Sequence, residues 1–83
     1  MQRFAVESTT LRSVGYESAE QILELEFTSG AVYQYFDVPE SVWHGLLKAE
    51  SKGKYFNREI RDDYSALPVR ARPRGNRVRR AGR

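Results

Sequence analysis

Seven arginines near the end of the chain offer the most distinctive chemistry in the sequence. They are Arg70, Arg72, Arg74, Arg77, Arg79, Arg80 and Arg83, and no acidic residue lies among them. A guanidinium group binds phosphate oxygens through two parallel hydrogen bonds. A basic segment that excludes acids is typical of an arm that binds nucleic acid, so we expect nucleic-acid phosphates as its partner. The alternative interpretation is a basic end that only raises solubility.

A second group of basic residues surrounds an aromatic side chain further up the chain. The group comprises Lys52, Lys54, Tyr55, Arg58 and Arg61. At a loop that leads into a helix, these side chains can hold a nucleic-acid backbone, helped by free N–H groups at the start of the helix. The structural alternative is that Gly53 ends one helix, that Ser51 or Asn57 satisfies backbone groups, and that both arginines pair with neighbouring acids.

Tyr33 and Tyr35 are candidates for stacking on the bases of a single strand, provided that their rings face solvent. Residues 21–36 alternate between apolar and polar side chains and return, after a break, as a second aromatic strand, which predicts a β-hairpin. The acids of the first strand, Glu24 and Glu26, would repel phosphate if they shared the face of the tyrosines. Packing of both rings in the core is the alternative.

The register of this hairpin decides which face the tyrosines occupy. A two-residue loop at Ser29-Gly30 puts them opposite the acids, on the solvent face. A type I turn over residues 28–30 with a bulge at Gly30 puts them on the face of Leu23 and Leu25 instead. The two-residue loop needs a positive φ at Ser29, whereas the bulged turn needs one only at Gly30. This steric difference favours the bulged register and the core position.

No group of residues predicts catalysis or a bound metal. His44 is the only histidine and cysteine is absent, so no histidine cluster or thiolate site can form. Ser8 and Thr9 have no nucleophile-elbow motif or partner histidine near them. The glycines are isolated and form no phosphate-cradling loop, and Glu24 and Glu26 alternate with leucines as solvated side chains. We therefore expect a protein that is not an enzyme and that has no cofactor and no metal.

Charge is divided unevenly along the 83 residues. Residues 1–64 hold all 11 acidic residues and 7 of the 14 lysines and arginines, whereas every charged residue in 65–83 is an arginine. We expect one folded domain over residues 1–64 and a disordered tail over residues 65–83, since the tail has no hydrophobic periodicity. No apolar run predicts a membrane span, and the first residues lack the apolar core of a secretory signal. We therefore expect a cytoplasmic protein.

The order of the expected elements predicts an α+β fold. Residues 4–7, residues 11–16 and the hairpin follow one another with short links, which favours a three- or four-stranded antiparallel meander. Gly15, within the second of these strands, indicates a bulge or a close approach of another backbone segment. Two short helices are expected after the sheet, packed together on one of its faces.

The first expected helix starts near Pro39, with Asp37 as its cap and Gly53 as its stop. Its apolar stripe at helical spacing includes Trp43, which we expect to anchor the helix to the sheet. A second helix is expected over residues 55–64, with its apolar side chains facing the sheet. Both helices would precede the basic tail.

Several short motifs occur in a fixed order along residues 4–65. They are Val14-Gly15-Tyr16, Gly30, Tyr33-Gln34-Tyr35, Val38-Pro39, Ser51-Lys52-Gly53-Lys54-Tyr55-Phe56-Asn57 and Ile60-Arg61. In this combination the chain resembles the KTSC domain, a short module of bacterial and phage proteins that also occurs at the C-terminus of some lysyl-tRNA synthetases. Thr9 stands where a second serine is common in that family, and the arginine tail lies outside the resemblance.

The resemblance brings no known activity with it, but the association with a tRNA synthetase implies RNA rather than DNA as the partner. Together with the basic tail, it leads to the hypothesis of a small non-enzymatic RNA-binding module. The tail would supply attraction to phosphates, and residues 52–61 would supply a contact edge. The alternative hypothesis is a protein-interaction adaptor, whose acidic domain holds a basic partner or presents exposed tyrosines such as Tyr16.

Overall fold

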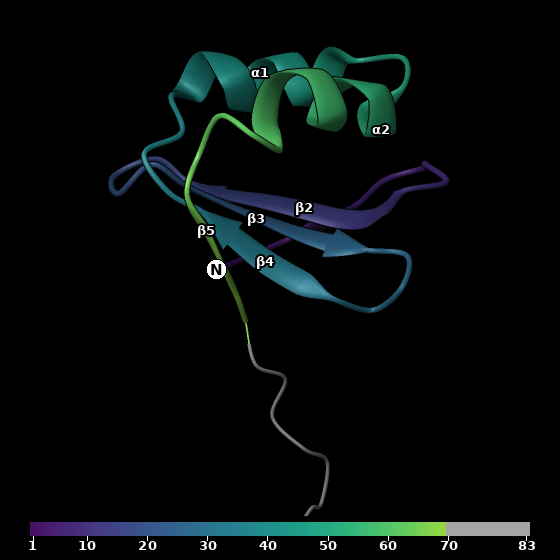
Figure 1. Cartoon of the computed structure of the whole chain (residues 1–83), viewed down its shortest axis with the longest axis horizontal. Helices are drawn as coiled ribbons and strands as arrows, with labels where there is room; N and C mark the ends of the chain where they lie inside the picture. Colours follow the sequence, from purple (N-terminus) through teal and green to yellow (C-terminus); the bar gives the residue numbers. More distant parts are fainter. Residues whose placement is uncertain (70–83) are drawn as a thin grey trace, which may run out of the picture.

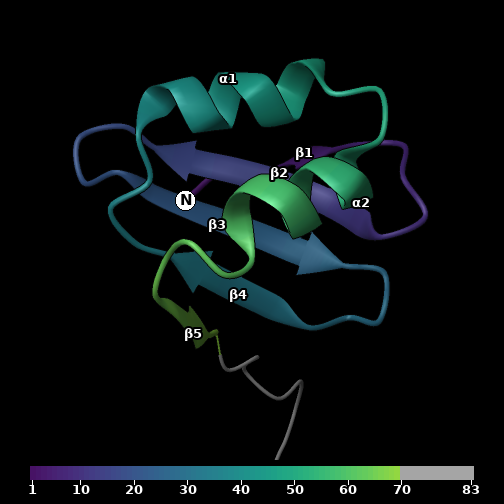
Figure 2. The same ribbon diagram turned by 45° about the horizontal axis from the view of Figure 1, so that its top comes forward.

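A five-stranded antiparallel sheet, covered on one face by helices, makes up the fold (Figures 1 and 2). The computed structural model describes residues 1–69. The strands lie side by side in chain order: β1 Phe4–Ala5, β2 Leu11–Glu17, β3 Ile22–Phe27, β4 Val32–Tyr35 and β5 Ala66–Pro68. The helical segments are α1 Glu40–Lys48, α2 Lys52–Tyr55 and the π-helix η1 Phe56–Ile60, which continues α2 directly. The predicted α+β meander with two short helices on one face is confirmed, although the sheet has five strands rather than three or four.

The β3–β4 hairpin adopts the bulged register that the sterics at Gly30 favour. Gly30 has a φ of 100°, and its N–H donates to the Phe27 carbonyl at 2.8 Å. The Phe27 N–H in turn donates to the Ala31 carbonyl at 2.8 Å. In this register Leu25 pairs with Tyr33, so the tyrosine side chains of β4 point to the same face of the sheet as the leucines of β3.

β5 corrects the prediction that the chain is unstructured from residue 65 onward. The Phe36 N–H donates to the Ser65 carbonyl at 3.0 Å, and the Val69 N–H donates to the Val32 carbonyl at 2.8 Å. Backbone bonds of this kind need no hydrophobic periodicity, which is why the sequence pattern did not reveal this strand. Because ladder bonds alternate along a strand, the backbone nitrogen of Pro68 points away from β4, where its missing N–H costs no bond.

The core lies between the sheet and the helices, where seven of the larger side chains within residues 1–69 are fully buried. They are Leu11, Val14, Leu23, Leu25, Val38, Leu46 and Ile60. Each of them contributes roughly 1.5–3 kcal/mol by leaving water. Aromatic rings fill the space between them: Phe56 meets Phe27 edge-on at 5.2 Å and Tyr35 at 5.7 Å. Trp43 of α1 stacks on Tyr16 of β2 with ring centroids 5.5 Å apart, which confirms the predicted anchor.

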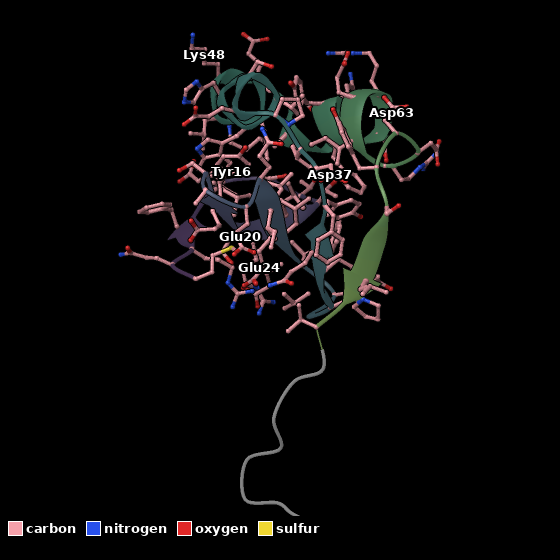
Figure 3. All side chains as sticks on the ribbon, turned by 90° about the vertical axis from the view of Figure 1, so that its left-hand side faces the viewer. Tyr16, Glu20, Glu24, Asp37, Lys48 and Asp63 are labelled. Atoms are coloured by element: carbon pink, nitrogen blue, oxygen red, sulfur yellow. The ribbon has the colours of Figure 1, made fainter. Side chains whose placement is uncertain are left out.

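The other face of the sheet is partly covered by the first residues of the chain. A Cβ at Gly15 would collide with the Gln2 carbonyl and lie 2.9 Å from Cγ of Arg3, which confirms the predicted close approach. The Arg3 guanidinium lies 3.5 Å from Oε2 of Glu24, whose Oε1 accepts a 2.8 Å hydrogen bond from Gln34. Glu24 is only 9% exposed. Figure 3 shows it on this face of the sheet, away from the helices. The prediction that Glu24 is solvated is therefore wrong, because the N-terminal segment covers it.

Glu26, the second acid of β3, is half-buried on the same face. Its Oε1 accepts a 2.8 Å hydrogen bond from the Ser13 hydroxyl, and its Oε2 lies 3.6 Å from the Arg12 guanidinium. The strand pairing shifts between Leu11 and Ser13, an irregularity of the kind that a β-bulge produces. The predicted solvation of Glu26 is thus also wrong, because neighbouring side chains of β2 bind its carboxylate.

The first helix begins where the sequence predicts but is built differently at both ends. Pro39 precedes the first helical residue, and no side chain caps the first turn. Asp37 lies in the preceding turn with a φ of 59°, so its predicted role as cap is wrong. The helix ends at Lys48, which means that Gly53 is not its stop. Asp37 therefore contributes the reversal of the chain between sheet and helix instead of the cap.

The second helix spans residues 52–60 rather than the predicted 55–64. The Ser51 hydroxyl accepts a hydrogen bond from the Lys54 N–H at 3.2 Å and caps the helix, so it starts earlier than its apolar pattern indicates. A Cβ at Gly53 would lie 3.0 Å from Cβ of Thr10, so this glycine lets the first turn approach the loop before β2. The chain then turns after Ile60 and returns to the sheet as β5.

Candidate functional site

An open pocket of about 370 Å³ lies where α1, the loop after it and α2 meet. The residues that line this α1–α2 pocket are Gly45, Lys48, Ala49, Glu50, Ser51, Lys54, Tyr55 and Arg58. Sites for small molecules have volumes of about 300–1,000 Å³, so the pocket has room for a small ligand. Lys54, Tyr55 and Arg58 belong to the predicted basic segment. The structure therefore gathers part of that segment around one cavity.

Tyr55 fixes α2 against α1 and forms a wall of the pocket. Its hydroxyl donates to the Val42 carbonyl at 3.2 Å. A Cβ at Gly45 would lie 2.7 Å from Cζ of Tyr55, so the ring can take this position only against a glycine. Burial raises the pKa of the Tyr55 hydroxyl, and the nearby Glu59 carboxylate raises it further, while Arg58 opposes both. The hydroxyl therefore keeps its proton and its role as a donor across the physiological range of pH.

Cations outnumber acids around the α1–α2 pocket. Lys48, Lys54 and Arg58 line it, and Glu50 is the one acid of the lining. Within residues 1–69, neither lysine takes part in an ion pair. Figure 3 shows Lys48 at the outer surface of the helical layer, whereas Glu24 lies on the far side of the sheet. Since residues 1–69 carry a net charge of −4, the pocket is a locally positive site on an acidic domain.

Arg58 is held at the pocket by two weak contacts. Its Nε lies 3.0 Å from Oε2 of Glu59, and its guanidinium carbon lies 6.0 Å from the centroid of the Tyr55 ring. Both side chains of the ion pair are well exposed, so the pair contributes only about 0–1 kcal/mol. A cation above an aromatic ring gains about 0.5–1 kcal/mol at an exposed site. The guanidinium is thus positioned at the lining yet can exchange Glu59 for an anionic ligand.

Two residues of the predicted basic segment have structural partners and do not line the pocket. Nζ of Lys52 donates to the Leu47 carbonyl at 3.2 Å and to the Ala49 carbonyl at 3.1 Å. These carbonyls lie at the C-terminal end of α1, where backbone acceptors lack helical partners and the helix dipole is negative. Arg61 lies 3.6 Å from the Asp62 carboxylate. The structure thus contains the ion pairs of the structural alternative, Arg61 with Asp62 and Arg58 with Glu59, whereas the backbone contacts of Lys52 were not predicted.

Lys48 is the cation of the lining that the sequence analysis did not select. A basic residue in the last turn of a helix is favourable by itself, so its presence suggested no further role. Gly45 and Lys48 are three residues apart and share one face of α1. Because Tyr55 packs against Gly45, this spacing also puts Lys48 on the face of α1 that Tyr55 contacts. The seven tail arginines, from Arg70 to Arg83, lie outside the described residues.

The two tyrosines of β4 pack beneath the helices. Tyr35 is only 6% exposed, and Tyr33 is half-buried with its ring against Phe27 at a centroid distance of 6.0 Å. Burial raises the pKa of the Tyr35 hydroxyl and the neighbouring Tyr33 raises it further, while Arg61 opposes them. Tyr35 therefore packs in the core and Tyr33 packs against it, as the core-packing alternative predicts.

Other classes of site leave no trace in the part of the chain that the structure describes. Among residues 1–69, no three side chains of histidine, cysteine, aspartate or glutamate come together as potential metal ligands. In the same residues, no helix has the length and apolar character needed to cross a membrane. The α1–α2 pocket is therefore the feature to weigh for a function.

A family model for the KTSC domain matches residues 7–64. The chain belongs to the KTSC domain family. The match includes the whole of the α1–α2 pocket, from Gly45 to Arg58. A KTSC domain protein from Yersinia pestis, known from its crystal structure, has the same fold. It aligns with a TM-score of 0.80 and 32% sequence identity, over 82% of this chain and 96% of that one. The resemblance inferred from the short motifs is thereby confirmed.

Relatives of two sizes share this KTSC domain. A protein of Stutzerimonas stutzeri is 47% identical over 64 residues, which are 77% of this chain and 90% of that protein. A protein of Tsukamurella paurometabola is 45% identical over 64 residues, which are 77% of this chain and 96% of that protein. A lysine–tRNA ligase of Nostoc punctiforme is 43% identical over 58 residues, which are 70% of this chain but only 10% of the ligase. The domain thus makes up most of two small proteins and a small part of a large enzyme.

Proposed function

We propose that this KTSC protein is a nucleic-acid-binding module that prefers RNA and has no catalytic activity of its own. The observation that carries the proposal is the α1–α2 pocket, where Lys48, Lys54 and Arg58 gather on a domain whose described residues have a net charge of −4. Cations that only kept a protein in solution would be spread over its surface, whereas these three converge on one cavity. A phosphate is the anion that such a group of lysine and arginine side chains suits best.

The preference for RNA rests on the enzymes in which the same domain occurs. The ligase of Nostoc punctiforme carries a KTSC segment and is named for its action on tRNA. Lysine–tRNA ligases of Trichormus variabilis and of a second Nostoc strain match this chain over the same number of residues. A domain joined to an enzyme of tRNA has RNA within reach, although the segment makes up only 10% of the ligase. This association supports RNA over DNA as the partner of the present chain.

The arginine tail and the pocket would have different roles in binding. The tail brings seven positive charges without an acid, so it supplies attraction that tolerates any sequence. If about five of these arginines contact phosphates, the logarithm of the binding constant should fall with the logarithm of the salt concentration at a slope of roughly −3.5 to −4.5. The pocket would fix one phosphate relative to the rigid domain and so orient the strand.

The test compares the whole chain with a chain that ends at Val69, using RNA and DNA of one sequence at two salt concentrations. The shorter chain keeps β5, which a cut after Tyr64 would remove. The Tsukamurella paurometabola relative, with only a few residues outside its match, supports a domain that folds without such a tail. We expect the whole chain to bind RNA with a steep salt dependence and the shorter chain to bind more weakly with a shallower one. Absence of binding by both at low salt would contradict the proposal, and equal affinity for DNA would contradict the preference.

The adaptor hypothesis has less support from the described residues. One of its two forms needs exposed tyrosines, but Tyr35 is buried, Tyr33 is half-buried and Tyr16 is stacked on Trp43. The other form, an acidic domain that holds a basic partner, keeps the support of the net charge of −4. A protein partner that remains bound after nuclease treatment, together with no binding to RNA, would favour this hypothesis over ours.

A further inference from the structure

We propose that the α1–α2 pocket binds the phosphomonoester group of a nucleotide, supplied either by the phosphorylated end of an RNA strand or by a free mononucleotide. For the RNA end, the inference rests on the proposed function and names the part of the strand that the pocket takes.

The pocket suits a chain end better than a strand that runs through it. Its lining comes from three consecutive segments: the last turns of α1, the loop at Glu50 and Ser51, and the helix that follows. The two helices touch on its inner side, where the Tyr55 hydroxyl donates to the Val42 carbonyl and the ring lies against Gly45. A nucleic-acid backbone cannot pass between helices that are in contact. The chain bends between α1 and α2 (Figure 2), and a ligand that enters the pocket at this bend is stopped by the contact of the helices.

The charges favour a phosphate that carries more than one negative charge. A phosphomonoester has a charge of about −1.5 to −2 at neutral pH, whereas a phosphodiester inside a strand has about −1. The lining holds Lys48, Lys54 and Arg58 against the carboxylate of Glu50, and Glu59 next to the lining pairs with Arg58, which leaves one cation in excess. Because the attraction grows with the charge of the ligand, an excess of cations discriminates in favour of the monoester.

Lys52 removes an obstacle that the end of a helix would otherwise present to an anion. The C-terminal end of α1 exposes carbonyl oxygens, and a negative ligand near them would be repelled. The ammonium group of Lys52 reduces this repulsion, since it donates hydrogen bonds to the carbonyls of Leu47 and Ala49 at 3.2 and 3.1 Å. The two neighbouring lysines, Lys48 and Lys54, are then left for the ligand. Lys52 is therefore a positioning residue for the pocket and not one of its contacts.

The aromatic ring of Tyr55 in the lining favours a nucleotide over phosphate alone as the ligand. Tyr55 is half-buried and lines the pocket, and the Arg58 guanidinium lies 6.0 Å from its ring centroid. Aromatic rings and guanidinium planes are the surfaces on which single nucleobases or riboses pack in RNA-binding proteins. The volume of about 370 Å³ exceeds what a phosphate needs and leaves space for an attached nucleoside group.

The experiment is a titration of the full ¹⁵N-labelled chain, followed by NMR, with adenosine monophosphate, with adenosine, and with one short RNA carrying either a 5′-phosphate or a 5′-hydroxyl. We expect the monophosphate, but not adenosine, to shift the amide signals of Gly45, Ser51 and Lys54. Replacing both lysines in the variant Lys48→Ala/Lys54→Ala should weaken this binding by about tenfold or more. The matched control is Arg12→Ala, which removes an exposed cation outside the pocket and should leave the affinity unchanged.

Each outcome decides the matter. A stronger affinity for the phosphorylated RNA supports the strand end as source, and equal affinity for both RNAs, with the monophosphate still in the pocket, supports the free nucleotide. If the monophosphate leaves the pocket amides unshifted, or binds the double-lysine variant as well as the unchanged chain, the inference is wrong. RNA binding that ignores the terminal phosphate, with no monophosphate in the pocket, overturns the inference but keeps the proposed function. Binding of the monophosphate in the pocket without any binding of RNA keeps the inference for the free nucleotide but overturns the proposed function.

Discussion

Replacing Gly45 by alanine should destabilise the domain, although alanine is the better helix former. In the middle of a helix, alanine is favoured over glycine by about 1 kcal/mol. Against this gain, the new Cβ would lie 2.7 Å from Cζ of Tyr55, and overpacking of this kind costs about 1–3 kcal/mol. The displaced ring would also lose the hydrogen bond to the Val42 carbonyl, which is worth about 1 kcal/mol. The expected net loss is roughly 1–3 kcal/mol.

Urea unfolding followed by the fluorescence of Trp43, the only tryptophan, measures this loss. The midpoint should fall at an unchanged slope m, because the surface exposed on unfolding stays the same. His44→Ala is the matched control, since it changes the neighbouring exposed residue of α1 and should alter stability by no more than about 0.5 kcal/mol. A Gly45→Ala variant that is more stable than the unchanged protein would refute the packing of Tyr55 against this glycine, and with it the inner wall of the pocket.

Three further changes test other contacts. Gly15→Ala should displace the Gln2 carbonyl and loosen the first residues from the sheet. We expect faster amide exchange in these residues and a free energy of unfolding that is lower by about 1–3 kcal/mol. Unaltered exchange would count against the close approach. Lys52→Met should lower the thermal stability by about 0.5–1.5 kcal/mol because the carbonyls at the end of α1 lose their donor, whereas Lys48→Met should change it little; equal effects would contradict the structural role. Burial raises the pKa of Tyr35 above its usual value of 10.0, so the folded state keeps a proton that the unfolded state releases. Stability present below pH 10.0 should therefore be lost as the pH rises through the pKa of the folded state, and urea midpoints on both sides of this range should fall less in Tyr35→Phe.

Features that depend on the local sterics of one residue could be predicted from the sequence. Only Gly30 tolerates the left-handed conformation that the bulged turn requires, and this fixed both the hairpin register and the face on which Tyr35 lies. The apolar spacing around Trp43 likewise predicted the helix and its anchor on the sheet. In each case the physical cause acts within a few residues, so the amino-acid order reveals it.

Features that depend on contacts between distant segments could not be predicted in this way. β5 joins the sheet through backbone bonds that any short extended segment can make, so its side chains carry no signal. Glu24 is buried because Arg3, far from it in the sequence, lies over the same face. The pocket arises where Gly45 meets Tyr55 across the loop. That contact gives Lys48 and the predicted basic residues, which are already close in the sequence, one shared cavity.

The backbone nitrogen of Pro68 faces the open margin of the last strand, and this has a consequence for copies of the protein held close together. A neighbouring molecule that tried to extend the sheet there would find no donor at this residue, and the opposite margin offers only the two residues of β1. Crowding along a polyanion, which the proposed function entails, would therefore bring together sheet margins that offer a neighbouring strand few hydrogen-bond partners. A proline in the ladder thus makes this margin less suited to pairing with the sheet of a second copy.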